Sequence, residues 1–412
     1  MESAPNRTTV AVVVSHPIQH FAPLYQALTL RNLDLRVLFL SRAGLDRYHD
    51  RGFGTQVQWS SDITGGYRHE FIADLALRPD WQQPNACLRA AGQVWTALDR
   101  LRPESVLIYG YRHTFNLAAL AWCLRRHVPV LMIGDSELLG RRSARARIAK
   151  RLALPPLLRR VDAFLTIGDN NEAYLADYGV PRSRMFRVPL TTDEAALREA
   201  LDQRDAHRRS VRTELGIDPA ALVALFSGKL IDRKRPLDLV NALRALARQP
   251  CGPRERQVVV VMAGDGQLRP ALEAAAAELD GALRLVGFAD QRQLPRLYAA
   301  SDLYVHPAQR DPHPLAVKEA VLSGLPVVVS DRVGSVGPTD DVRPGRNGRV
   351  YPVGDVTALA RILDELRRSP DLLAEMAQES EKAIGDIELA ASVEGFLRAV
   401  SAVCSPVGPG SR

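Results

Sequence analysis

Two lysines that stand five positions apart are the first residues of this chain with an evident chemical use. Lys229 and Lys234 lie in the stretch FSGKLIDRKRPLDLV, after a predicted strand that ends at Gly228 and before a helix predicted to begin near Pro236. The chain has only five lysines, so two in one loop are unusual. Ammonium groups and helix N-termini both attract phosphate oxygens. We therefore predict phosphate binding here, with two solvated lysines as the alternative.

Two glycines and a pair of carboxylates follow in the same half of the chain. Gly264 and Gly266 stand between a predicted strand and helix, where they could bring the backbone close to a ligand or form an ordinary turn. Asp311 and Glu319 are separated by seven residues in DPHPLAVKE. The prolines make the loop after Asp311 irregular and leave Glu319 on the next helix. These carboxylates could bind a sugar and a ribose diol, or be routine surface charges.

The order of these motifs resembles the C-terminal domain of family 4 nucleotide-sugar glycosyltransferases. The matching stretches are G-[RK]-x4-K, GDGxL, VGF followed by LYAASDLYVHP, and an acidic residue separated by seven residues from the glutamate that opens EAVLSGLPVVVSD. They cover roughly residues 220–360. The resemblance implies a GT-B fold, a nucleoside diphosphate sugar as co-substrate, transfer with retention of anomeric configuration, and neither a metal nor another cofactor.

The resemblance also implies roles for single residues. Lys229 and Lys234 match the pair that grips the donor diphosphate, Glu319 matches the glutamate that binds the ribose, and Asp311 matches the acid against the transferred sugar. The segment 286–288 matches the strand end that meets the nucleobase. The expected donor site comprises Gly228, Lys229, Lys234, Gly264, Val286, Phe288, Asp311, Pro314, Leu315 and Glu319.

Two departures from the family pattern leave the donor sugar open. Asp311 is one methylene shorter than the usual glutamate, and His313-Pro314 replaces the usual Phe-Gly. Because Pro314 has no N–H, it lacks a donor that relatives commonly aim at the sugar or phosphate.

The N-terminal half offers candidate residues for the acceptor. His16, Gln19 and His20 follow the first predicted strand and could contact the acceptor or a phosphate, or cap a helix. Arg112 and His113 follow another strand, where the family often has a histidine directed at the donor sugar. Asp135, in IGDSE, could orient the acceptor as a base or cap a helix. The expected acceptor site is His16, Gln19, His20 and Arg112, and the expected catalytic residues are Lys229, Lys234, Asp311, His113 and Asp135.

Alternating strand and helix patterns occur twice and predict the elements that position these residues. Strands are expected at 9–15, 35–40, 105–109, 129–133 and 163–167, and again at 222–227, 257–263, 282–286, 303–306, 327–330 and 348–351. Such alternation predicts an α/β protein with two Rossmann-like, doubly wound domains that face each other across a cleft. The expected divisions are an acceptor-binding domain (8–190), an interdomain connection (191–212), a donor-binding domain (213–385), a C-terminal helix near the N-terminal domain (386–403) and a flexible tail (404–412).

Composition excludes several other classes of protein. The chain of 412 residues is 46% hydrophobic and 25% charged, as in soluble globular proteins, and no apolar run approaches the ~18 residues of a membrane-spanning helix. Its four cysteines form no CxxC pair, which disfavours a disulfide framework and a zinc site. No Asp-x-Asp occurs, as expected of a metal-independent transferase. The start of the chain lacks a secretory pattern, so a cytoplasmic location is expected.

The net charge of +7 is concentrated in one segment. Residues 141–160 hold eight basic residues and no acidic one. Such a helix can sit peripherally on an anionic membrane, as at the inner membrane face, or be an ordinary solvated helix. Nucleic acid is not an expected partner, because no aromatic platform accompanies the charge.

The predicted function is that of a hexosyltransferase-type glycosyltransferase. It would move a sugar from a nucleoside diphosphate to an acceptor hydroxyl with retention and without a metal. A GT-B nucleotide-sugar epimerase and a non-catalytic nucleotide-sugar-binding protein are the alternatives. The acceptor could be a glycan, a lipid-linked intermediate or a small molecule.

Overall fold

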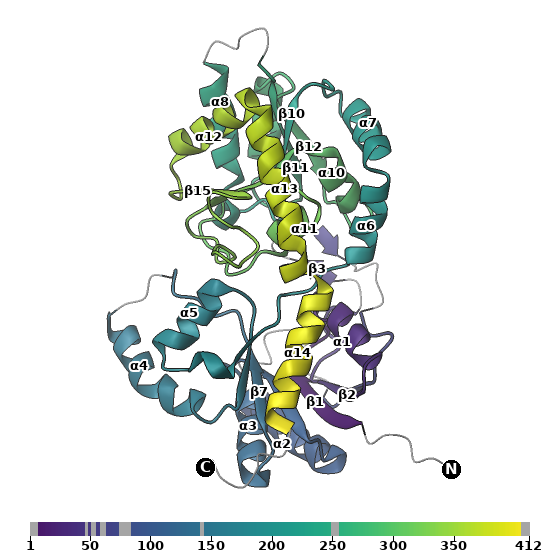
Figure 1. Ribbon diagram of the computed structural model, residues 1–412, viewed down its shortest axis with the longest axis vertical. Helices are drawn as coiled ribbons and strands as arrows, with labels where there is room; N and C mark the ends of the chain where they lie inside the picture. The colour runs from purple at the N-terminus through teal and green to yellow at the C-terminus, as the bar shows by residue number, and fades with distance from the viewer. Residues whose placement is uncertain are drawn as a thin grey trace.

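The computed structural model describes residues 7–45, 48–50, 55–57, 63–73, 84–140, 144–248 and 255–404. These residues form two α/β domains, each built around a parallel β-sheet (Figure 1). The prediction of two Rossmann-like domains is confirmed.

The N-terminal domain has a seven-stranded sheet with the order β5-β2-β1-β6-β7-β8-β9. Its strands are β1 (Thr8–Val14), β2 (Leu33–Phe39), β5 (His69–Phe71), β6 (Ser105–Tyr109), β7 (Val130–Ile133), β8 (Ala163–Thr166) and β9 (Met185–Arg187), and β3 (Tyr48–Asp50) and β4 (Thr55–Val57) form a separate hairpin. Its helices are α1 (Ala22–Thr29), α2 (Pro84–Leu101), α3 (Thr114–Arg126), α4 (Ala144–Leu158) and α5 (Asp169–Asp177).

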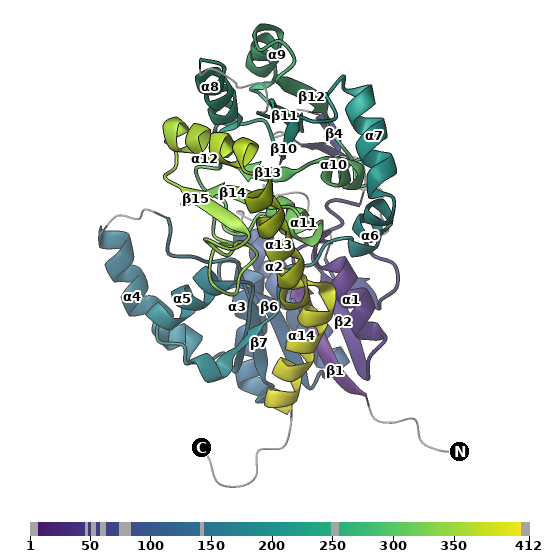
Figure 2. The same cartoon turned by 45° about the horizontal axis from the view of Figure 1, so that its top comes forward.

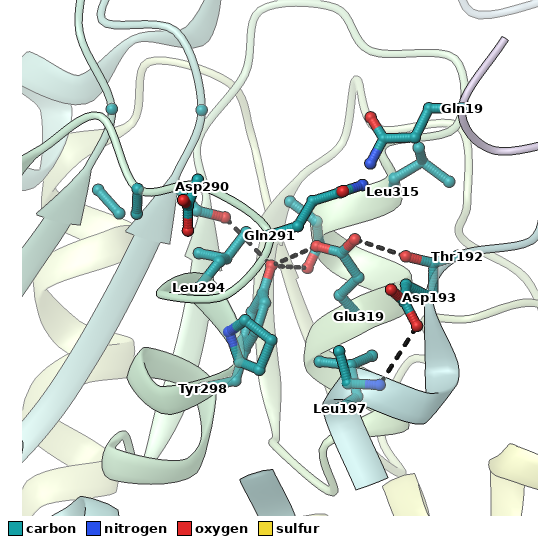
Figure 3. Close-up of a pocket in the computed structure, with 18 of the residues that line it drawn as sticks. Gln19, Thr192, Asp193, Leu197, Asp290, Gln291, Leu294, Tyr298, Leu315 and Glu319 are labelled. Carbon is teal, nitrogen blue, oxygen red and sulfur yellow. Dashed lines mark hydrogen bonds between the residues drawn. The ribbon is translucent and has the colours of Figure 1, made fainter. Parts of the chain in front are cut away.

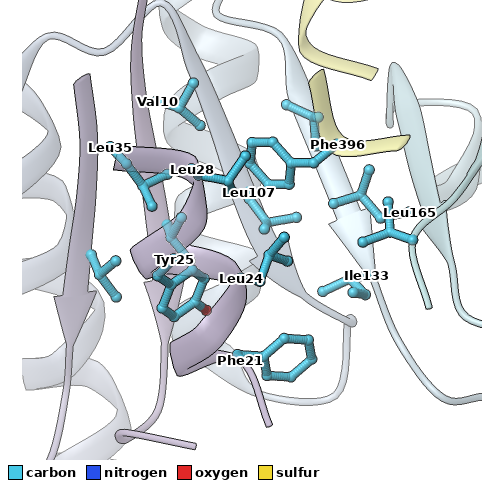
Figure 4. Packing of buried hydrophobic residues seen from close by; sticks show 14 of the residues in the cluster. Val10, Phe21, Leu24, Tyr25, Leu28, Leu35, Leu107, Ile133, Leu165 and Phe396 are labelled. Atoms are coloured by element: carbon cyan, nitrogen blue, oxygen red, sulfur yellow. The ribbon is translucent and has the colours of Figure 1, made fainter. Parts of the chain in front are cut away.

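Two apolar cores, one on each face of this sheet, hold the N-terminal domain together. Along β1, Val10 and Val12 face α1 and the C-terminal helix α14 (Leu389–Cys404), whereas Val13 faces the core under α2 and α3. Figure 4 shows the first core, in which Phe396 of α14 packs among side chains of α1 and the sheet. Because both faces of a central strand are buried, its sequence is a continuous run of apolar residues.

The C-terminal domain has a six-stranded parallel sheet with the order β12-β11-β10-β13-β14-β15. Its strands are β10 (Leu222–Ser227), β11 (Val258–Ala263), β12 (Leu283–Gly287), β13 (Leu303–His306), β14 (Val327–Ser330) and β15 (Gly348–Tyr351). Its helices are α6 (Glu194–Asp202), α7 (Arg204–Glu214), α8 (Pro236–Ala247), α9 (Arg269–Glu278), α10 (Leu294–Ala300), α11 (Leu315–Leu322), α12 (Val356–Arg368) and α13 (Pro370–Ile387).

The segment 191–212 differs from the interdomain connection that its charge suggested. Most of it forms α6 and α7, which pack against α10 of the C-terminal domain. Leu197 and Val211 are buried there. Part of the high charge serves the same packing, because Arg208 and Arg212 both pair with Asp302, at 2.7 and 2.9 Å. The charged pattern therefore marks two amphipathic helices.

The chain passes between the domains a second time through the break between α13 and α14. Helix α14 packs on β8, β9 and α1 of the N-terminal domain (Figures 1 and 2). Gly395 allows this close approach, because a Cβ at that position would lie 1.8 Å from the Arg187 carbonyl oxygen. The Ser392 hydroxyl also donates to the Pro189 carbonyl, at 2.8 Å. Within the described residues, no helix is both long enough and apolar enough to cross a membrane.

A polar contact joins the start of α5 to a loop of the C-terminal domain. The Asp169 carboxylate accepts hydrogen bonds from the backbone N–H and the hydroxyl of Thr339, at 2.8 and 2.6 Å. In return, the Asp340 carboxylate accepts from the Asp169 N–H at 2.7 Å, at the positive end of the helix dipole. These contacts fix one side of the cleft between the domains.

We expect Gly337→Ala to break this contact. The new Cβ would lie 2.2 Å from an Asp169 carboxylate oxygen and 2.6 Å from its Cβ, so the two segments must separate. Losing charged hydrogen bonds of this kind costs about 2 kcal/mol. A lower Tm and a larger radius of gyration by small-angle X-ray scattering would show it. Gly385→Ala, which meets nothing within 4 Å, is the control, and equal values for both variants would contradict the prediction.

Candidate functional site

Two adjoining cavities lie where the carboxyl ends of strands from the two sheets face each other. The small cavity, of about 260 Å³, lies mainly on the C-terminal domain. The large cavity, of about 1320 Å³, is lined by both domains. Four residues border both cavities, namely Ser227, Gly228, Leu315 and Ala316. Ligands of open α/β sheets bind at such strand ends.

Glu319 contributes a carboxyl group to the wall of the small cavity. It projects from α11, and its two carboxylate oxygens accept from the Thr192 hydroxyl at 2.7 Å and from the Tyr298 hydroxyl at 3.0 Å. Burial raises the pKa of Glu319, and these two hydrogen bonds oppose the rise. Figure 3 shows Glu319 between Thr192 and Tyr298, with Gln291 nearby. The carboxylate is thus held in one orientation while lone pairs stay open to further donors.

Glycine is required at two positions of the loop that follows β11 beside this cavity. Gly264 has a φ of +153°, and a Cβ there would lie 1.8 Å from the Gly228 carbonyl oxygen. Gly266 has a φ of +151°, and its Cβ would lie 2.6 Å from the Leu230 carbonyl oxygen. The glycines therefore let the loops after β10 and β11 lie against each other. Gly264 also borders the small cavity, and approach of its backbone to a ligand stays a prediction.

An ion pair lines the large cavity, and a buried histidine lies behind it. Lys234 pairs with Asp311, and His306 Nε2 lies 2.9 Å from Asp311 Oδ2. Burial opposes ionisation of Asp311, but the hydrogen bond with His306 and the charge of Lys234 outweigh it and hold the pKa well below its usual range. The carboxylate is therefore ionised, although it is only 8% exposed.

The N-terminal wall of the large cavity carries Arg112, His113 and Asp135. His113 precedes α3, is half-buried and stacks on Phe115 with ring centres 5.2 Å apart. Burial, with a smaller contribution from Arg112, lowers the pKa of His113. Arg112 and Asp135 are exposed. All three polar residues thus line the large cavity.

Lys150 of the basic segment also reaches this wall. Its Nζ lies 4.6 Å from the centre of the Tyr174 ring, 5.5 Å from that of Tyr178 and 5.7 Å from that of Tyr111. Cation–π contacts of this kind orient an ammonium group. Two apolar side chains of the same helix, Ile148 and Leu152, are 61% and 74% exposed. Membrane contact by this segment stays a prediction, because its arginines at 141 and 142 lie outside the described residues.

A buried charge cluster lies behind the loop that follows Asp311. His313 Nε2 lies 3.2 Å from Asp341 Oδ2, and Asp340 lies on its other side. Burial disfavours the charged imidazole, but Asp341 and Asp340 outweigh it and raise the pKa of His313. Burial raises the pKa of Asp340 to about 6. The positions of these three side chains could hold a metal ion. Burial opposes ionisation of Asp341, but His313 and Lys318 outweigh it and lower its pKa.

The structure gathers most of the predicted site residues at the two cavities. Those at the small cavity are Gly228, Gly264, Phe288, Leu315 and Glu319, and those at the large cavity are His20, Arg112, His113, Asp135, Gly228, Lys229, Lys234, Asp311, Pro314 and Leu315. Burial, helped by His16 and His313, lowers the pKa of His20 to about 4, so this ring is neutral at pH 7.

Three predicted residues lie elsewhere than expected. Gln19, predicted for the acceptor, borders the small cavity instead of the large one. His16 lines neither cavity, and its Nδ1 lies 2.8 Å from the neighbouring Ser15 hydroxyl. Val286 lines neither cavity because it packs against the core beneath the sheet, whereas Phe288 reaches the pocket.

Several residues of the site could not be picked out from the sequence. Thr192, Tyr298 and His306 contact the two carboxylates, and Lys150 joins the cavity wall. Arg310 and the buried Glu137 pair across the domains at 3.0 Å. One local signal existed, because His306 ends a strand five positions before Asp311. The others come from elements remote in sequence.

Comparison with known proteins defines the architecture. The chain is similar to a glycosyltransferase from Rickettsia africae, with a TM-score of 0.73 and 11% identity over 98% of this chain and 100% of the other. It is also similar to HepE of Anabaena in complex with UDP and glucose, with a TM-score of 0.66 and 14% identity over 96% and 100% of the two chains. The fold is GT-B.

Sequence similarity concerns part of this GT-B chain. Residues 207–383 match the family model described as glycosyl transferases group 1. A D-inositol 3-phosphate glycosyltransferase of Nocardia farcinica is 31% identical over 229 residues, which are 55% of this chain and 49% of that protein. The chain thus spans about half the length of the curated relatives that it matches.

Proposed function

We propose that the protein is a glycosyltransferase that moves a sugar from a nucleoside diphosphate donor to an acceptor hydroxyl. The observation that carries this proposal is the arrangement of Glu319, Lys229, Lys234 and Asp311 along two cavities that share a wall. The match of residues 207–383 to glycosyl transferases group 1 supports it. HepE, a structural neighbour, is described in complex with UDP and glucose.

Each end of the proposed donor meets a suitable group. The small cavity receives the nucleoside, and the Glu319 carboxylate accepts hydrogen bonds from the ribose hydroxyls. The diphosphate lies at the shared wall, where Lys229, Lys234 and the start of α8 supply positive charge. The sugar then lies in the large cavity beside Asp311. Positive charge preorganised at the leaving diphosphate stabilises the transition state.

Family 4 membership, retention and metal independence are further parts of this proposal. They rest on the motif order and on lysines placed where a divalent cation would otherwise neutralise the diphosphate. We expect the product to keep the anomeric configuration of the donor in NMR spectra and the rate to be unchanged by EDTA. An inverted product would contradict retention, and loss of activity in EDTA would contradict metal independence.

We further propose that the acceptor carries an anionic group. Among the described residues, neither Arg112 nor Lys150 has a carboxylate within ion-pair distance, and both line the large cavity away from the proposed diphosphate site. Lys150 is held in place by its three tyrosine rings. The curated relatives are named D-inositol 3-phosphate glycosyltransferases, which is consistent with a phosphorylated acceptor.

Lys150→Met should weaken use of an anionic acceptor. We expect the KM for D-inositol 3-phosphate to rise about tenfold, with the donor KM unchanged, because one charge-assisted contact is lost. Steady-state kinetics with D-inositol 3-phosphate and unphosphorylated inositol measure the effect. Lys382→Met, an exposed lysine on α13, is the matched control. Equal use of both acceptors by the unmodified protein would contradict an anionic acceptor.

A further inference from the structure

A run of polar contacts passes from the large cavity into the protein interior. It begins at Lys234, which pairs with Asp311. Asp311 Oδ2 lies 2.9 Å from His306 Nε2, and His306 Nδ1 lies 3.2 Å from the Tyr304 hydroxyl. His306 and Tyr304 are both 0% exposed. The Asp311 carboxylate is therefore held from the cavity side by a lysine and from the interior by a histidine.

The same run continues to the small cavity. The Tyr304 hydroxyl lies 3.1 Å from the Ser227 carbonyl oxygen, and the Ser227 hydroxyl lies 3.1 Å from that of Tyr298. Tyr298 in turn donates to Glu319 at 3.0 Å, and Thr192 donates to the other oxygen at 2.7 Å. One buried run of polar contacts thus connects the two carboxylates, which the proposed function places at opposite ends of the donor.

We propose that His306 is a positioning residue, which holds the Asp311 carboxylate toward the sugar when Lys234 turns to the donor diphosphate. This inference rests on the proposed function. An ammonium group that also contacts a diphosphate divides its three N–H donors and its charge between the two anions, which weakens its contact with Asp311. His306 supplies a contact that remains when the lysine shifts. The buried run of polar contacts behind His306 keeps its imidazole from rotating.

The charge of Asp311 determines the direction of its hydrogen bond with His306. Asp311 is ionised and can only accept, so His306 carries a proton on Nε2. Burial, together with Lys234, lowers the pKa of His306. The lowered pKa favours the neutral ring, in which Nδ1 is an acceptor. The single proton of the Tyr304 hydroxyl is then shared between His306 Nδ1 and the Ser227 carbonyl oxygen, which lie 3.2 and 3.1 Å from the hydroxyl oxygen.

Donor consumption by variants at position 306 tests the inference. We expect His306→Leu to lower kcat about 10- to 100-fold while the donor KM changes less than about threefold. Loss of the hydrogen bond raises the pKa of Asp311, so the acid limb of the kcat–pH profile moves to higher pH. In His306→Gln an amide N–H can approach the Nε2 position, and we expect most of the lost kcat to return. His69→Leu, an exposed histidine on β5, is the matched control.

Nitrogen-15 NMR of the histidine rings supplies a measurement that needs no turnover. The inference predicts a neutral His306 ring with its proton on Nε2, and a changed Nε2 resonance in Asp311→Asn. A ring protonated on Nδ1 would overturn it. So would a His306→Leu variant that loses kcat without a shifted pH profile and without rescue by glutamine, because that pattern marks a structural role.

If the unmodified protein consumes no sugar nucleotide, the proposed function fails and the inference about catalysis fails with it. Turnover with an unaffected His306→Leu overturns the inference alone.

Discussion

Lys234→Ala should lower kcat by on the order of 10²-fold or more while the protein stays folded. The side chain points into the large cavity, 13% exposed and paired with Asp311, where it would meet the diphosphate. Its charge is needed most when the leaving group gains negative charge, so the loss falls on kcat more than on donor binding. Steady-state kinetics with saturating donor measure it.

Controls separate this effect from a loss of stability. Lys382→Ala removes an exposed lysine whose partner, Glu379, lies on the same helix, and it should leave kcat unchanged. Thermal unfolding should show Lys234→Ala to be folded, because His306 still contacts the Asp311 carboxylate. An unaltered kcat in folded Lys234→Ala would remove this lysine from the proposed mechanism.

Glu319→Ala should reduce kcat/KM for the donor by about 10²-fold or more, chiefly through KM. Two ribose hydroxyls would each lose a hydrogen bond to a charged acceptor, and such bonds contribute about 1.5–3 kcal/mol each. Binding of the nucleoside diphosphate alone, measured by calorimetry, should weaken in the same proportion. The change is confined to the small cavity, because Glu319 contacts Thr192 and Tyr298 there.

Two further variants show whether the effect of Glu319→Ala comes from the loss of its carboxylate. Tyr298→Phe leaves the Glu319 carboxylate in the pocket but removes one of its donors, so its effect should be smaller. Glu375→Ala, at an exposed position of α13, is the matched control. If Glu319→Ala bound the nucleotide as tightly as the unmodified protein, the ribose would have to lie elsewhere.

The fold could be predicted because its signals are local. The buried strands of both sheets are apolar runs between helical patterns, and the structure has strands at each of those places. The strands β5 and β9 were not expected, because three residues are too few to show a pattern. The charge of 191–212 was misleading because α6 and α7 bury apolar side chains, and two arginines of α7 pair with Asp302 within the same packing.

The site was predictable where one motif holds both the residue and its position. Lys229, Lys234, Asp311 and Glu319 each follow a strand end, so the topology alone brings them to the cleft. The sequence could not show for each single residue whether its side chain points into the cavity or into the core. Val286 and Phe288 are two positions apart and would face the same side of a regular strand. Strand β12 ends at Gly287, whose φ of +73° turns the chain, so Phe288 lines the pocket while Val286 packs on the core. Contacts between distant elements, such as Thr192 with Glu319, leave no trace in local sequence.

The consumption of a sugar nucleotide is the most direct test of the central claim. The protein is incubated with a panel of nucleoside diphosphate sugars, with and without D-inositol 3-phosphate, and each donor is followed by mass spectrometry together with Lys234→Ala. The account predicts that one donor is consumed in the presence of acceptor, that a glycosylated acceptor of matching mass appears, and that the variant is at least about 10²-fold slower. Conversion of a donor to an isomer without acceptor would identify an epimerase, and nucleotide binding without any donor loss would identify a non-catalytic protein. Either result would contradict the account.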